Sequence, residues 1–339
     1  MSAAGLEIVS IPGATSARRS AVATPREARG TPVVLLHGIF DSVHRWTGGE
    51  LEKLGLPDRK ILAVPFDVEA LRPSERFGYS PKQAMPGLLP RLAAEGIPAI
   101  GFSYQEGLAP VAPMAEAVAA TEKVALFAME RWNSDRVSLL GYSRGGLVAR
   151  HAAGLPSLAG RLDRLVTLCT PHLGSGIANM AVRIEAQIAR FREFALRLVG
   201  ARDDRTEEAA GAFEEFLNLA TNLAGLSPES PEVRDAPTPE FPGGVFALAG
   251  SVPTYFRASI FPAPDFELPP APSGWLPRSL RAAEFAPTAG DGAVTVASAL
   301  GYPGQRAERT LVLPVNHMQA AFCAAAHDRV TAWLREPVR

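Results

Sequence analysis

The pattern of apolar and polar positions along the chain predicts buried strands that alternate with amphipathic helices. Short continuous apolar runs are typical of strands covered on both faces of a parallel sheet, and we place strands at residues 31–36, 97–102, 137–140, 165–169, 245–250 and 310–313. Apolar residues at helical spacing place helices at residues 115–131, 145–155 and 318–334. This alternation predicts an α/β fold, with a mostly parallel sheet and helices on both of its faces.

One region interrupts the alternation. Residues 176–226 carry two helical patterns with no strand between them, and a proline-rich stretch follows. We predict a helical cap inserted into the core; two ordinary helices packed on the sheet are the alternative. The first residues are either a poorly ordered arm or an extension of the sheet edge. The predicted division is an arm at 1–30, a core at 31–175 and 243–339, and a cap or lid at 176–242.

The composition is that of a globular protein with a sizeable core, since 47% of the 339 residues are hydrophobic and 20% are charged. Net charge is −1, which argues against nucleic-acid partners and polybasic membrane patches. No apolar run reaches the ~18 residues of a transmembrane helix, and the N-terminal arginines lack the apolar segment of a secretory signal. We expect a cytoplasmic protein; a transit peptide is the alternative. Cys169 and Cys323 show no metal-binding spacing, and we expect Cys169 to be a buried core thiol.

A Gly-x-Ser-x-Gly pattern stands between a predicted strand and a predicted helix. Gly141, Ser143 and Gly145 directly follow the strand at 137–140 and open the helix at 145–155. This context is typical of a nucleophile elbow, a sharp turn that lifts a serine hydroxyl into a cleft. Glycine suits both flanks because the strained turn leaves no room for a Cβ atom. We predict Ser143 as a nucleophile.

Acyl transfer through a serine also needs a base and an acid that orients it, and after such an elbow the acid precedes the histidine. Of the two histidines far along the chain, His317 stands in a loop after the last strand and His327 lies inside the last predicted helix. We therefore predict His317 as the base. Asp291, in a Gly-Asp-Gly turn ahead of it, is our candidate acid, with Asp265 and Glu267 as rivals. The alternative role for Asp291 is that of a simple turn former.

Two backbone amides are candidates for the oxyanion hole that such chemistry requires. The N–H of Arg144 follows the nucleophile at the start of a helix, where N–H groups are unpaired and the dipole is positive. The second donor should come from the loop after the first strand, where Ile39 is the candidate. We expect His37 to brace that loop, and His172 to shape a loop or line a pocket.

These segments as a set resemble the α/β-hydrolase lipases and esterases. The segments that carry the resemblance are His37-Gly38-Ile39, Gly141-Tyr-Ser-Arg-Gly-Gly146, Thr170-Pro-His-Leu-Gly-Ser175, Gly290-Asp-Gly-Ala-Val-Thr-Val-Ala-Ser298 and His317. The Gly-Asp-Gly segment is most similar to the lecithin–cholesterol acyltransferase and lysosomal phospholipase relatives. The His-Gly-Ile segment is more similar to that of bacterial lipases. The likeness covers about residues 31–175 and 285–335. It implies a catalytic triad of Ser143, Asp291 and His317, with the amides of Ile39 and Arg144 as the oxyanion hole.

The chain departs from these relatives in two ways. It lacks the cysteine pairs that the acyltransferase relatives carry in their membrane-binding segments. It also has no histidine between His172 and His317, so the zinc site of some thermophilic lipases has no obvious ligand set. We expect neither a cofactor nor a metal ion.

The sequence thus predicts a serine ester hydrolase, of lipase, carboxylesterase or phospholipase type, that cleaves an apolar acyl ester through an acyl-enzyme. An acyltransferase with the same triad is the nearest rival, since it differs only in whether an alcohol outcompetes water. A catalytically silent α/β-hydrolase that serves as a binding module is the rival from another class. The expected partner is a lipid-like or other apolar ester, which is compatible with transient contact with a membrane surface.

Overall fold

A computed structural model of the chain describes part of its length, and all structural statements here concern that part. The described residues are 6–8, 20–23, 30–39, 41–50, 84–85, 87–104, 111–176, 178, 223–252, 257–258, 266–267, 283–285 and 288–337.

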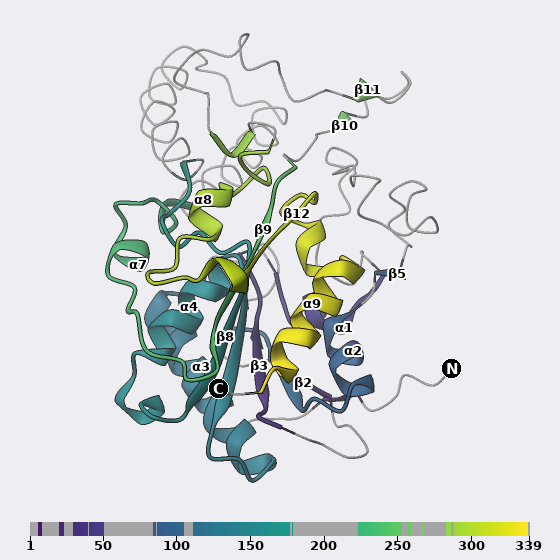
Figure 1. Cartoon of the computed structure of the whole chain (residues 1–339), viewed down its shortest axis with the longest axis vertical. Coiled ribbons are helices and arrows are strands. Elements are labelled where there is room, and N and C mark those ends of the chain that lie inside the picture. The colour runs from purple at the N-terminus through teal and green to yellow at the C-terminus, as the bar shows by residue number, and fades with distance from the viewer. Residues whose placement is uncertain are drawn as a thin grey trace, which may run out of the picture.

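One eight-stranded sheet organises the described residues, in the order β1-β2-β6-β3-β7-β8-β9-β12 (Figure 1). The six strands from β6 to β12 run parallel, while β2 runs antiparallel to β6 and β1 antiparallel to β2. This arrangement confirms the predicted fold class. The strands of the sheet are β1 (Leu6–Ile8), β2 (Ser20–Ala23), β3 (Val33–Leu36), β6 (Ala99–Phe102), β7 (Val137–Tyr142), β8 (Leu162–Leu168), β9 (Gly244–Gly250) and β12 (Thr310–Leu313).

The first two strands come from the N-terminal arm, so this part of the arm extends the sheet edge. Two small sheets stand apart from the main one, each made of two antiparallel strands. They are formed by β4 (Gly49–Glu50) with β5 (Ala84–Met85), and by β10 (Arg257–Ala258) with β11 (Phe266–Glu267).

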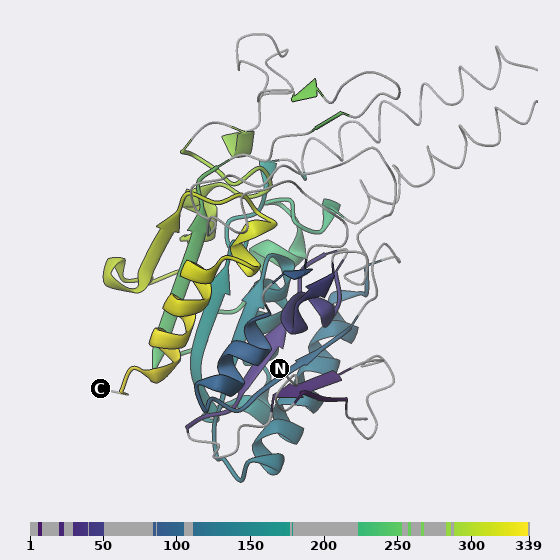
Figure 2. The same cartoon turned by 90° about the vertical axis from the view of Figure 1, so that its right-hand side faces the viewer.

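Helices cover both faces of the main sheet, as Figures 1 and 2 show. The alternation of side chains along β3 divides the core. Val34 and Leu36 pack with α3 (Met114–Arg131) and α4 (Arg144–Ala153) on one face. Val33 and Leu35 pack with α1 (His44–Thr47), α2 (Leu88–Ala94) and α9 (Ala324–Arg335) on the other. Both sides of each central strand are therefore buried, which explains the uninterrupted apolar runs.

The last helix begins later than the sequence pattern predicts. A 3-10 turn covers Gln319–Ala321, and α9 starts only at Ala324. Reciprocal side-chain bonds hold the chain in this turn: the Asn316 N–H donates to Gln319 Oε1 and the Gln319 N–H to Asn316 Oδ1, both at 2.9 Å. Side chains that satisfy main-chain groups in this way compete with regular helix. Our prediction of a helix from residue 318 was wrong at its start.

Most of the predicted cap lies outside the described residues, including positions 179–222 of the two helical patterns predicted over 176–226. From residue 223 the chain is described again and contains α7 (Pro231–Arg234). Here Leu226, Val233 and Ala236 pack against Leu147 of α4. The segment 223–236 is thus packed against the helix that follows Ser143.

Candidate active site

Ser143 stands in a strained turn between the central strand β7 and helix α4. Its φ of 54° and ψ of −129° lie in a region that residues other than glycine rarely adopt. The surrounding backbone holds it there: the Ser143 N–H donates to the carbonyl of Leu168 at 2.8 Å, and its own carbonyl accepts the N–H of Gly146 at 3.1 Å. This is the geometry of a nucleophile elbow.

The glycines around Ser143 are required by close packing. A Cβ atom on Gly141 would lie 2.5 Å from the main chain of Gly145, and one on Gly145 would lie 2.5 Å from the carbonyl oxygen of His37. A Cβ atom on Gly146 would come 2.6 Å from the Thr170 methyl group. A Cβ atom closer than 3.0 Å to these groups would force the neighbouring atoms to move. Glycine at the three positions therefore lets β7, the turn at Ser143 and the loops after β3 and β8 pack directly against one another.

His317 joins Ser143 to Asp291. Its Nε2 lies 2.9 Å from Ser143 Oγ, and its Nδ1 lies 2.8 Å from Asp291 Oδ2. The Asp291 side chain is 1% exposed and that of His317 is 12% exposed. The other carboxylate oxygen, Oδ1, accepts the N–H groups of Ala293 at 2.9 Å and Val294 at 2.7 Å. Asp291 therefore forms its turn and contacts the imidazole at the same time.

Several residues that the sequence patterns did not single out position His317. The hydroxyl of Tyr142 donates to the His317 carbonyl at 3.0 Å, and the two rings lie 5.2 Å apart. The guanidinium of Arg45 lies 5.1 Å from the Tyr142 ring and 4.5 Å from the ring of Phe322, and it pairs with the buried Asp41. Tyr142 occupies the variable position of the Gly-x-Ser motif, so the motif itself did not mark it.

The loop after β3 backs directly onto Ser143, since a Cβ atom on Gly38 would lie 3.0 Å from that of Ser143. The His37 ring stacks on Tyr104 at 4.2 Å, and the Tyr104 hydroxyl donates to the His37 carbonyl. Burial is the main reason that the pKa of His37 falls to about 4, so the ring stays neutral. Its Nδ1–H donates to the Gly38 carbonyl at 2.8 Å. His37 thus braces the loop that carries Ile39.

Arg144 contributes more than its backbone. Its side chain is 1% exposed, and its Nε and Nη2 each donate to a carboxylate oxygen of Glu232 in α7 at 3.0 Å. Nη2 also donates to the Ala112 carbonyl at 3.0 Å. These hydrogen bonds connect α7 to the first residue of α4.

The rival candidates lie elsewhere or outside the described residues. His327 is buried within α9 with its Nε2 2.7 Å from the Ala321 carbonyl oxygen, which leaves His317 as the histidine beside Ser143. His172 contacts Thr167 and Arg150, and burial lowers its pKa to about 3. Glu267 belongs to the small β10–β11 sheet. Asp265 lies outside the described residues.

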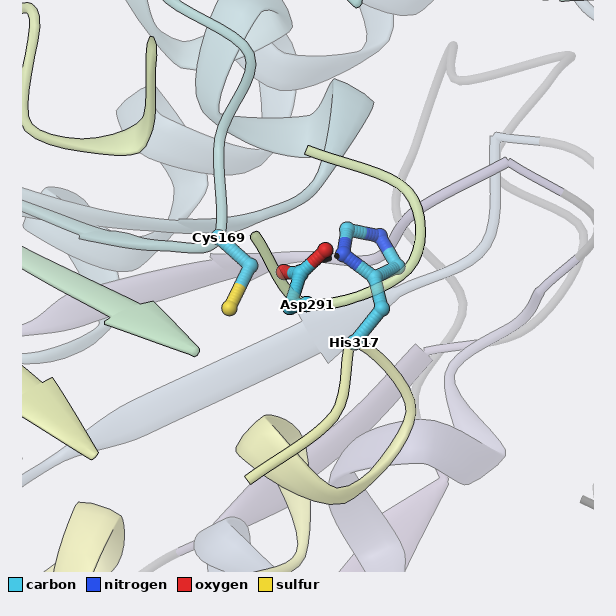
Figure 3. Close-up of side chains that lie close together, drawn as sticks. All are labelled: Cys169, Asp291 and His317. Carbon is cyan, nitrogen blue, oxygen red and sulfur yellow. Dashed lines mark hydrogen bonds and ion pairs between the residues drawn. The ribbon is translucent and has the colours of Figure 1, made fainter. Parts of the chain in front are cut away.

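Cys169 is buried, as expected of a core thiol, and it also lies beside Asp291. Figure 3 shows the Asp291 carboxylate between the Cys169 side chain and the His317 ring. Within the described residues these three side chains form the one group of ligand-type atoms that could hold a metal ion, all within 4.8 Å of one another. Two of the three already belong to the arrangement around Ser143.

The strand order and the turn at Ser143 after a central strand decide the fold. The chain has an α/β-hydrolase fold. Residues 111–195 match the model of a family described as "Putative serine esterase (DUF676)". The matched segment contains the turn at Ser143, the strand β7 before it and the strand β8 that follows α4. This match supports an enzyme of the ester-hydrolase class and agrees with the resemblance to lipases and esterases.

Solved structures with similar folds include esterases and lipases. The mature lipase BlEst2 of Bacillus licheniformis is 15% identical, with a TM-score of 0.48 and coverage of 93% of this chain and 97% of that one. The esterase EaEST of Exiguobacterium antarcticum is 13% identical, with a TM-score of 0.46 and coverage of 94% and 96%. A thermophilic esterase of Thermogutta terrifontis is 15% identical, with a TM-score of 0.42 and coverage of 98% of both. No curated protein matches the chain.

None of the helices in the described part of the chain combines the length and the hydropathy needed to cross a lipid bilayer.

Proposed function

We propose that the protein is a serine ester hydrolase in which Ser143 is the nucleophile, His317 the general base and Asp291 the acid that orients the base. The observation that carries this proposal is the continuous path of hydrogen-bonding distances through His317, 2.9 Å to Ser143 Oγ and 2.8 Å to Asp291 Oδ2. Such a path lets the serine proton pass to the imidazole as Oγ attacks a carbonyl carbon. The family match over residues 111–195 supports the same class of reaction.

The proposed reaction has two halves. Ser143 Oγ bonds to the ester carbonyl carbon while its proton moves to His317 Nε2, and the buried Asp291 carboxylate stabilises the resulting imidazolium. The tetrahedral intermediate then expels the alcohol, which takes the proton from Nε2 and leaves an acyl group on Ser143. Water attacks this acyl-enzyme in the same way, giving its proton to Nε2, and the acid product departs as Ser143 recovers its proton.

The oxyanion of each intermediate needs donors near Ser143, and we propose the N–H groups of Arg144 and Ile39. Arg144 opens α4, where the first N–H groups lack intrahelical partners and the helix dipole is positive. Ile39 follows Gly38, whose main chain lies against Ser143. The stacked, neutral His37 holds this loop in place.

We further propose an apolar acyl chain as the part of the substrate that the protein recognises. The support comes from the sequence of the proposed cap at 176–242, whose helical patterns carry large apolar residues outside the described part of the chain: Ile184, Ile188, Phe191, Phe213 and Phe216. Each buried methylene would contribute about 0.8 kcal/mol. A p-nitrophenyl ester series should therefore show kcat/KM rising with chain length until the pocket is filled.

We also propose that the protein is located in the cytoplasm. Cys169 and Cys323 are both free thiols, which suits a reducing compartment.

Ester turnover by purified wild type and Ser143→Ala tests the proposed reaction. We expect the variant to lose about four to six orders of magnitude in turnover while its melting temperature is retained. Product analysis in the presence of a competing alcohol separates hydrolysis, which yields free acid, from acyl transfer, which yields a new ester. Unchanged turnover in Ser143→Ala would contradict the assignment of the nucleophile.

A further inference from the structure

Two buried serine hydroxyls join the loop after β8 to the turn that contains Asp291. Ser175, in the loop, donates to the Ala293 carbonyl at 2.7 Å. Ser298, which follows the turn, donates to the Gly174 carbonyl at 2.7 Å. The two serines are 4% and 3% exposed. Each segment thus supplies a hydroxyl to a main-chain carbonyl of the other, so the contact is reciprocal.

Further hydrogen bonds extend this junction on both sides. The Leu173 N–H donates to Ser298 Oγ at 3.1 Å, so this hydroxyl accepts one bond and donates another. The Gly176 N–H donates to Oε1 of the buried Glu284 at 2.5 Å, and the Glu284 carbonyl accepts the Gly292 N–H at 3.0 Å. The four loop residues that begin at Leu173 are therefore each hydrogen-bonded to the turn or to a residue beside it.

Ala293 connects the Ser175 hydroxyl to Asp291. Its carbonyl accepts from Ser175, while its own N–H donates to Asp291 Oδ1 at 2.9 Å. The next residue, Val294, donates its N–H to the same oxygen at 2.7 Å, and its carbonyl accepts the Asp291 N–H at 3.1 Å. A displacement of Ala293 would therefore move N–H groups that bind the carboxylate.

The loop is also held from its other side. Gly174 has a φ of 84°, a conformation that favours glycine, and a Cβ atom there would lie 2.5 Å from the main-chain nitrogen of Pro228. The Ser175 N–H donates to the Leu226 carbonyl at 2.8 Å. Because residues 226–228 hold the loop, it can serve as a fixed support for the turn, as precise sites require of the residues around them.

We propose that Ser175 and Ser298 are positioning residues for the proposed acid: their hydroxyls hold the turn of Asp291 against the loop after β8, and so keep its carboxylate in place beside His317. This inference rests on the proposed function, because it concerns the same acid and base. It also gives a role to the last residues of two segments that carry the resemblance to lipases and esterases, 170–175 and 290–298.

The separate effects of Ser175→Ala on kcat and KM distinguish positioning from packing. Without the hydroxyl the turn can shift, so kcat should fall by about tenfold or more while KM stays within about twofold, since the acid acts in the transition state. Ser298→Ala should have the same effect. Thr331→Val is the matched control, because the Thr331 hydroxyl is also 4% exposed and donates to a carbonyl, that of His327, at 2.7 Å. It should lower the melting temperature about as much as Ser175→Ala and leave kcat unchanged.

A second readout is independent of turnover. The low-field proton resonance between His317 and Asp291 should shift in the two serine variants and stay in place in Thr331→Val. If Ser298→Ala does not fold, Ser175→Ala decides alone. A wild-type kcat with an unshifted proton in Ser175→Ala, or the loss of its fold, would overturn the proposal and leave the hydroxyl a packing role. Failure of the proposed function looks different: turnover would then survive Ser143→Ala, whatever the other serine variants do.

Discussion

The main-chain N–H of His317 donates to the carbonyl oxygen of Asp291 at 2.9 Å, while the side chains of the same two residues meet at 2.8 Å. The proposed acid and base are thus joined twice, although Asp291 precedes α8 (Val296–Ala299) and His317 follows β12. The double link fixes the imidazole relative to the carboxylate without help from a substrate. In the proposed mechanism this arrangement is formed before the ester binds, which is the condition for efficient catalysis by fixed polar groups.

Asp291→Asn should be far more damaging to turnover than Asp265→Asn. An amide can take the place of the carboxylate in space, but it favours the wrong imidazole tautomer and cannot stabilise the imidazolium, so a loss of about four orders of magnitude in kcat is expected. Both variants should keep the wild-type melting temperature to within a few degrees. Turnover of a p-nitrophenyl ester measures the effect. If Asp265→Asn were the crippling change, the acid would be misassigned and Asp291 would be only a turn former.

Gly145→Ala should impair both folding and turnover, because the added methyl group would overlap the ends of the strand and loop that precede the proposed oxyanion donor Ile39. Gly304→Ala is the control for crowding: its φ of 76° is unfavourable for alanine, but nothing lies within 4 Å of the added carbon. We expect about 1 kcal/mol of destabilisation in the control and several times more in Gly145→Ala. Urea unfolding compares them, and equal losses would show that the elbow tolerates the methyl group.

Glu232→Ala should destabilise the protein by about 2 kcal/mol or more, because it leaves the Arg144 guanidinium buried without its carboxylate. The matched control lies three residues away: Asp235 pairs with Arg234, but both side chains are more than half exposed. Asp235→Ala should leave the melting temperature unchanged, since exposed ion pairs contribute little. Thermal melts of the two variants test the difference. Equal melting temperatures would mean that the Arg144 pair does not anchor α7.

Stability should fall as the pH is lowered below about 6.5, the ordinary pKa of histidine. The folded protein holds His37 and His172 neutral down to about 4 and about 3, so in this window the unfolded chain binds more protons. Each histidine can then contribute up to about 1.4 kcal/mol of lost stability per pH unit. Urea unfolding of wild type and His172→Gln at several pH values should show a shallower slope in the variant. Parallel slopes would mean that His172 is not buried in its neutral form.

The sequence predicted the core of the fold because continuous apolar runs, such as the one ending at Leu36, mark strands buried on both faces. It could not predict the start of α9, which depends on two side chains, Asn316 and Gln319, that satisfy each other's main-chain N–H groups. The cap remains a prediction, since most of it lies outside the described residues.

Asp291 and His317, which lie beside Ser143, were predicted from motifs and chain order. The residues that hold them in position, such as Tyr142, were not predicted. Tyr142 acts through its hydroxyl on the carbonyl of His317, a contact between residues 175 positions apart. Contacts of this kind leave no local periodicity in the sequence.

Covalent labelling with a fluorophosphonate tests the central claim most directly, because the reagent reacts with a serine only when a base activates it. Peptide mass spectrometry of the labelled wild type should place the phosphonyl group on Ser143. Ser143→Ala should remain unlabelled, and His317→Ala should be labelled far more slowly, with both variants folded. Labelling that survives Ser143→Ala, or a folded wild type that takes up no label, would contradict an activated nucleophile at this position.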